Sequence, residues 1–200
     1  MPLETLVKPI TYGLGMAYIS LCAVAIRTRA TTVEPHFVQA EHDPAVSPVA
    51  TTGAAWFAVV KPYCNSVEVE TTLSARPAPP GLDGVGYQAA CLALAGKIDR
   101  ARSAIATLPE ASRWKAAGIV FNVAHPVADA GDDASAGPIM AMVVDFWPNH
   151  TMALYHAGAA EAALGDVASA RRHLTAFLKY YHERDGWRTS AQSILGKIRQ

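Results

Sequence analysis

The chain has 200 residues, and its 17 lysines and arginines equal its 17 aspartates and glutamates. This balance provides no net positive field and no basic run that could follow a phosphate backbone, so nucleic acid is excluded as an expected partner. Apolar residues make up 51% of the chain and aromatic residues only 8%, which favours close helix packing through alanine, valine and leucine over a β-sandwich.

The first feature along the chain is an apolar segment at residues 10–26, which contains no charged residue. A helix needs roughly 17 to 25 apolar residues to cross a bilayer, so this segment is long enough for one span. Glycine and alanine four residues apart would let a second membrane helix approach closely. We therefore predict a single transmembrane anchor at residues 1–29, which contacts lipid and membrane-protein subunits through Tyr12, Gly13, Ala17 and Tyr18.

A cleaved signal peptide is the alternative interpretation of this segment. Residues 23–25 read Ala-Val-Ala, which has the small-residue pattern of a processing site. Glu4 offsets Lys8, however, and leaves little positive charge ahead of the apolar run, which favours the uncleaved anchor. Because single N-terminal anchors often carry exported domains, we expect the remainder of the chain to lie outside the cytoplasm, in a periplasm.

Two segments with different sequence patterns follow the predicted anchor. Residues 30–47 contain prolines and show little periodicity, which predicts a linker. Residues 48–81 begin with a short apolar run that Pro62 ends, and Asn65 then has the position of an N-cap with Glu68 as its capping-box partner. Apolar and polar residues also alternate over 67–73 as in a strand, and only the helical context favours a helix there.

The cysteines do not identify a site. Cys22, Cys64 and Cys91 form no CxxC pair and are too few for a disulfide scaffold. They therefore indicate neither a metal site nor a redox compartment. The sequence leaves open whether Cys64 and Cys91 are bonded to each other.

From residue 82 onward the chain repeats itself, with glycines at positions 96, 131 and 165. Each glycine has a small residue seven positions earlier, an alanine five positions later, and larger apolar residues nine and twelve positions later. Small residues let two antiparallel helices approach, the glycine permits the turn between them, and the larger residues pack against the next pair. The small residues at these helix contacts are Ala89, Ala101, Ala124, Ala136, Gly158 and Ala170.

This pattern resembles tetratricopeptide repeats, which are helix-turn-helix units with a period of about 34 residues. The resemblance implies an all-α fold, a TPR-like α-solenoid, with three repeats over residues 82–184. Residues 48–81 are expected to form a degenerate leading repeat, and residues 185–200 a capping helix. Pro126 and Pro138 depart from the pattern because they fall inside two predicted helices, where each removes a backbone hydrogen bond and predicts a kink or a late start.

Polar residues near the expected helix starts are interpreted as N-caps. Asp132 follows the turn glycine of the middle repeat, and Asp185 precedes the last apolar face. After Pro148, either Asn149 or Thr151 is expected to cap the next helix. These positions account for much of the polar sequence without invoking a site.

Histidines and carboxylates give no recognisable catalytic or metal motif. His125, Asp129 and the aspartates at 132 and 133 do not follow the order of a calcium loop. His150 and His156 are six residues apart and so lie on different faces of one helix. His173 has no carboxylate placed to orient it by sequence spacing. We therefore predict no enzyme activity, no metal, no cofactor and no small-molecule substrate, with an enzyme using the His125 and Asp129 region as the weakest alternative.

The resemblance also implies a binding surface. Arrays of this family use a concave groove, lined by the first helix of each repeat, to hold segments of other proteins. Mapped onto this chain, the groove is largely small and apolar, which fits an apolar helix or extended segment held by burial. The expected partner-binding residues are Ala90, Leu94, Phe121, His125, Asp129, Met152, Tyr155 and Ala159.

The function expected from these features is that of a membrane-anchored scaffold or accessory subunit, which binds protein partners through its repeats and its anchor. A periplasmic or secreted adaptor with a cleaved signal peptide is the second interpretation. The intact mass of the mature chain separates the two.

Overall fold

The computed structural model describes residues 52–198. The predicted anchor at residues 1–29, with Tyr12, Gly13, Ala17 and Tyr18, and the predicted linker at 30–47 lie outside the described residues. Among residues 52–198, no helix combines the length and the apolar character that a membrane span requires.

Every regular element between residues 52 and 198 is helical, as the composition predicted. Short elements come first, and longer helices follow from residue 82 onward. The elements are α2 (Gly53–Val60), η1 (Lys61–Tyr63), α3 (Val69–Ala75), α4 (Leu82–Leu94), α5 (Ile98–Ala106), α6 (Glu110–Asp129), α7 (Asp133–Phe146), α8 (Thr151–Ala163), α9 (Val167–Tyr180) and α10 (Gly186–Lys197).

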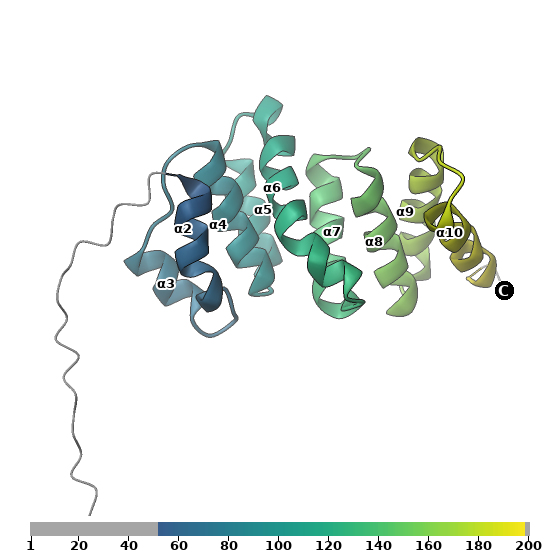
Figure 1. Ribbon diagram of the computed structural model, residues 1–200, viewed down its shortest axis with the longest axis horizontal. Coiled ribbons are helices and arrows are strands. Elements are labelled where there is room, and N and C mark those ends of the chain that lie inside the picture. The colour runs from purple at the N-terminus through teal and green to yellow at the C-terminus, as the bar shows by residue number, and fades with distance from the viewer. Residues whose placement is uncertain (1–51, 199–200) are drawn as a thin grey trace, which may run out of the picture. The chain divides into compact units, whose positions relative to one another are not determined.

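The helices form consecutive antiparallel pairs, as Figure 1 shows. Neighbours in sequence pack against one another from α4 to α10, and α4 also packs along α6. One apolar cluster joins the helices from α2 to α8, and a second joins α8, α9 and α10. This arrangement is compatible with a helical repeat fold.

The turn glycines have the role that the sequence predicted. Gly96, Gly131 and Gly165 have φ angles of 73°, 79° and 88°, in the left-handed region where side chains with a Cβ are strained. Each lies just after the first helix of a pair, where it ends α4, α6 or α8. The period in the sequence is therefore a period of helix turns.

Small residues bring the paired helices together, also as predicted. Ala101 and Ala170 are completely buried. A Cβ added to Gly158 would lie 2.7 Å from Cγ of Leu174, and one added to Gly137 would lie 2.7 Å from Cβ of Ala160. A side chain larger than glycine at either position would therefore push two helices apart.

The segment before α4 is helical and cross-linked. The alternating stretch at 67–73 lies mostly in helix α3, and Asn65 accepts hydrogen bonds from the backbone N–H groups of Val67 and Glu68, both at 3.0 Å. A disulfide joins Cys64 to Cys91 and so ties this segment to α4. The sequence alone had not decided whether these two cysteines are bonded.

Two of the predicted N-caps are correct and two are not. The N-cap of α3 is Glu68, without a side-chain hydrogen bond, rather than Asn65. Asp132 accepts a hydrogen bond from the N–H of Ser135, and Asp185 accepts from the N–H groups at 187 and 188. The cap of α8 is His150, rather than Asn149 or Thr151, because its Nδ1 accepts from the N–H of Ala153 at 3.2 Å. An imidazole nitrogen here replaces the usual side-chain oxygen.

Both prolines that departed from the repeat pattern lie inside helices. Pro126 is in α6, which has 20 residues, and Pro138 is in α7. Proline lacks a backbone N–H, so each helix loses one internal hydrogen bond there. Of the two expected outcomes, a kink or a late start, the late start did not occur at either proline.

Candidate functional site

Aromatic and histidine rings form a continuous row across α6, the C-terminal end of α7, α8 and α10, which we call the aromatic strip. Neighbouring ring centroids along this row lie between 4.1 and 5.7 Å apart, within the range of favourable aromatic contacts. It joins first helices of successive pairs and the capping helix, which is where the expected groove lies. The strip consists of Trp114, Trp147, His150, Phe121, His125, His156, Trp187 and Tyr155.

The two ends of the strip are open to solvent. Trp114 is 42% exposed and packs edge-on against Trp147, and Trp187 is 38% exposed and packs edge-on against Tyr155. Large aromatic side chains with this exposure are suited to burial against another molecule. The sequence did not identify either tryptophan as a surface residue.

The aromatic residues predicted to line the groove are covered by their neighbours. Phe121 is 8% exposed and lies between His125 and His150, with ring centroids 4.6 and 4.1 Å away. Tyr155 is 9% exposed, and its hydroxyl hydrogen-bonds to the hydroxyl of Ser190 at 2.8 Å. Neither of these two predicted partner-binding rings is therefore freely accessible at the surface.

The other predicted groove residues divide by burial. Ala90 is buried, while Leu94, Met152 and Ala159 are partly buried against the apolar clusters. The two polar residues of the prediction comprise a partly buried imidazole and an exposed carboxylate. Those two residues are His125 and Asp129.

His125, Asp129 and His156 meet at the middle of the strip. Nε2 of His125 lies 3.4 Å from Oδ1 of Asp129, and Nε2 of His156 lies 3.5 Å from the same oxygen. Helix spacing explains the first approach, since His125 and Asp129 are four residues apart on α6. His156 arrives from α8, with its ring 5.0 Å from that of His125.

Burial acts against the charged form of two histidines in the strip. It lowers the pKa of His156 below the ordinary value of 6.5, and the charge of His125 lowers it further, while Asp129 and Asp133 oppose this. Burial also lowers the pKa of His150, which a backbone hydrogen bond partly offsets. Neutral imidazole has a free lone pair on one nitrogen, which can accept a proton or bind a metal.

A second histidine and carboxylate pair lies between α8 and α9. Nδ1 of His173 is 2.7 Å from Oε2 of Glu161, and both side chains are largely buried. Burial raises the pKa of Glu161, and the hydrogen bond and charge of His173 oppose that rise. The expectation that no carboxylate orients His173 is wrong, because the two helices bring Glu161 to it.

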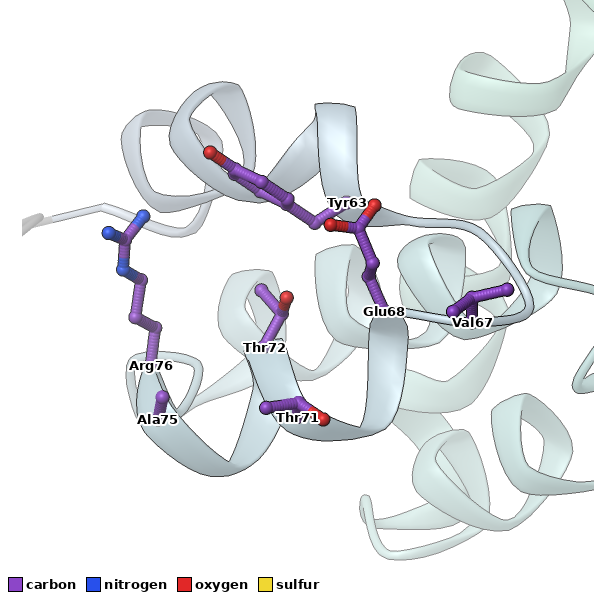
Figure 2. Close-up of a pocket in the computed structure, with 7 residues that line it drawn as sticks. All are labelled: Tyr63, Val67, Glu68, Thr71, Thr72, Ala75 and Arg76. Atoms are coloured by element: carbon purple, nitrogen blue, oxygen red, sulfur yellow. The ribbon is translucent and has the colours of Figure 1, made fainter. Parts of the chain in front are cut away.

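A separate shallow pocket of about 480 Å³ lies beside α3. Figure 2 shows Tyr63 on one side and Thr72 facing it, with Arg76 at one end. Glu68 also lines the pocket and accepts a hydrogen bond from Asn65 at 2.7 Å. The charged residues of this lining are Glu68 and Arg76, and it contains no histidine, so the histidine cluster is the stronger candidate site. The lining residues are Tyr63, Val67, Glu68, Thr71, Thr72, Ala75 and Arg76.

The approach of His156 to His125 was missed because spacing was considered within one helix only. In the register of the repeat, His125 lies six residues before Gly131 and His156 lies nine residues before Gly165. These positions differ by three residues, which is close to one helical turn. Aligning the repeats would have placed the two imidazoles on similar faces of successive first helices.

The chain was compared with family models, curated proteins and solved structures, and none of the three comparisons found a match.

Proposed function

We propose that this chain is a helical-repeat scaffold of the tetratricopeptide type, which binds an apolar segment of another protein along the aromatic strip. The observation that carries the proposal is the continuity of the strip across three helices with an exposed tryptophan at each end. Aromatic side chains supply large contact areas with few rotatable bonds, which is why they dominate binding hot spots.

The two exposed tryptophans differ from the other residues of the strip in what they can contribute. Trp114 is supported by Trp147, whose ring also contacts His150 at 4.4 Å. Trp187 is supported by the rings of Tyr155 and His156. Each is therefore held in place before a partner arrives, which reduces the entropy lost on binding.

The predicted anchor would tether this scaffold to a membrane, and the partner would be a subunit of the same membrane-associated complex. The uncharged residues 10–26 support the tether. The bond between Cys64 and Cys91 supports an exported array, because structural disulfides persist in oxidising compartments. No enzymatic step is part of this proposal.

Site-specific photo-cross-linking in the native cell tests the proposal. A photo-reactive phenylalanine derivative replaces Trp114 or Trp187 in the full chain, and we expect both positions to cross-link to the same second protein. Trp114→Ala combined with Trp187→Ala should weaken retention of that protein in mild detergent by about 2 kcal/mol or more.

Tyr180 provides the matched control. It is an aromatic residue with 39% exposure, it lies on α9, and it is not part of the strip. The same derivative at position 180 should give no cross-link to the partner. Equal cross-linking from all three positions, or cross-links only between copies of this chain, would contradict the proposal.

A further inference from the structure

The cluster at the middle of the aromatic strip holds two buried nitrogens for which the fold supplies no partner. Nε2 of His125 and Nε2 of His156 are shielded from solvent, and neither has a hydrogen-bond partner among residues 52–198. The side chain of His156 is only 8% exposed. Burying a polar atom without a partner is costly, and native proteins rarely leave one so. Two such nitrogens beside the same carboxylate oxygen indicate that a ligand completes them.

The two nitrogen-to-carboxylate spacings match those around a small cation. All three donor atoms lie within 4.8 Å of one another, and the two nitrogen-to-carboxylate distances are 3.4 and 3.5 Å. Ligand atoms around a tetrahedral zinc, at bond lengths near 2.0 Å, are separated by roughly 3.3 Å. Both carboxylate distances exceed the usual range of a direct N–H···O hydrogen bond, which ends near about 3.2 Å. The donors are therefore placed better around an ion than against each other.

The electrostatics of the cluster favour a cation. Asp129 is the last residue of α6, where the helix dipole is negative and attracts positive charge. Within the described part of the chain, the two imidazoles are the only basic groups paired with Asp129.

We propose that His125, Asp129 and His156 bind one divalent transition-metal ion, for which zinc is the best match. Two imidazoles and one carboxylate suit zinc and related ions, whereas magnesium and calcium prefer oxygen ligands alone. Three protein ligands leave one position open, and the 48% exposure of Asp129 leaves that side accessible to water. This site is independent of the scaffold proposal, since it needs no protein partner.

The test is a zinc titration of the full chain against a chromophoric chelator, with Co²⁺ absorption as a second readout. We expect one zinc ion per chain, and a visible Co²⁺ spectrum of a four-coordinate site that zinc displaces. Asp129→Asn, which keeps the shape of the side chain, should weaken zinc binding by at least about tenfold, since even partners outside the ligand shell contribute that much. His125→Ala, at a side chain that is 30% exposed, should do the same.

Two controls separate this site from other histidines. His173→Ala removes the paired imidazole between α8 and α9 and should leave zinc affinity unchanged. A full chain in which His36 and His42 are replaced by alanine should also retain the site, which excludes the N-terminal histidines as the ligands. The proposal is overturned if Asp129→Asn binds zinc as tightly as the unmodified chain, if the His36 and His42 variant loses binding, or if no stoichiometric zinc binds.

Discussion

Two groups of histidine and carboxylate side chains share helix α8. They differ in whether the imidazole nitrogens have hydrogen-bond partners. The pair formed by His173 and Glu161 is closed, because its two atoms are 2.7 Å apart and satisfy each other. The group formed by His125, Asp129 and His156 is open, because its nitrogens stand 3.4 and 3.5 Å from the carboxylate and have no hydrogen-bond partner in the described chain. The same residue types therefore serve different purposes.

The difference follows from where each group lies in the helix array. The closed pair spans the contact between α8 and α9, where direct bonding holds two helices together. The open group spans successive first helices, α6 and α8, on the side that carries the aromatic strip. A group that only stabilised the fold would be expected to resemble the closed pair. The open group is consequently the one to which a ligand is assigned.

The largest predicted effect concerns the aromatic support of the open group. Phe121→Ala should lower the free energy of unfolding by about 3 kcal/mol or more, because it leaves a cavity between two imidazoles in a buried position. It should also weaken zinc binding by releasing His125. Denaturant unfolding measures the first effect, and Tyr180→Ala, on the exposed side of α9, is the control that should change little.

The next prediction separates stability from metal binding. Glu161→Ala should lower the free energy of unfolding by about 2 kcal/mol, because it leaves the largely buried His173 without its partner. Asp129→Ala should change it by less than about 0.5 kcal/mol, because that carboxylate is exposed and bonds to no donor at a normal distance. Zinc affinity should respond in the opposite way and fall only in Asp129→Ala. Parallel losses of both properties in either variant would remove the distinction between the two groups.

A smaller effect is expected from pH. The pKa values of His150 and His156 are lowered in the folded chain, so the unfolded chain binds more protons near pH 6.5. Their contribution to stability is present above pH 6.5 and is lost as pH falls through the lower folded pKa values. The metal-free melting temperature should therefore decline between about pH 7 and pH 5.

His156→Gln should make that decline shallower, since it removes one of the two titrating groups. The charges that act on His156 are those of His125, Asp129 and Asp133, and all three remain in this variant.

Zinc should raise the melting temperature at pH 7 and lose this effect near pH 5, because protons compete for the same nitrogens. A melting temperature that rises on acidification would contradict the sign of these pKa shifts.

The smallest effect is predicted for His182→Ala. His182 is exposed and lies beyond the end of α9. Its removal should change the free energy of unfolding by less than about 0.5 kcal/mol and leave zinc affinity unaltered. A clear effect on either property would show that a histidine outside the two groups contributes to stability or to zinc binding.

The helix pairs could be predicted from sequence because their causes are local. A glycine such as Gly165 turns the chain within a few residues, and an alanine such as Ala170 marks a helix contact at a fixed distance from it. Asp185 caps the last helix for an equally local reason. These glycine and alanine positions recur with the period of the helix pairs, so each repeat strengthens the prediction of the others.

The candidate site could be predicted only in part because its members come from different helices. His125 and Asp129 were noticed together since they are one turn apart on α6. His156 and Glu161 reach their partners through the packing of helix pairs, which spacing along one helix does not reveal. The exposure of Trp187 likewise depends on how α10 rests on α8, where its ring contacts Tyr155 and His156.

The most direct measurement is the nitrogen resonances of the histidine rings in the full chain, recorded by long-range ¹H–¹⁵N correlation in mild detergent before and after one equivalent of zinc. The ring nitrogens of His125 and His156 should change together, while those of His173 and His150 keep their positions, because among residues 52–198 the buried ring nitrogens without a partner belong to the open group. Unchanged resonances for His125 and His156, or an equal change at His173, would contradict the assignment of a metal to the open group.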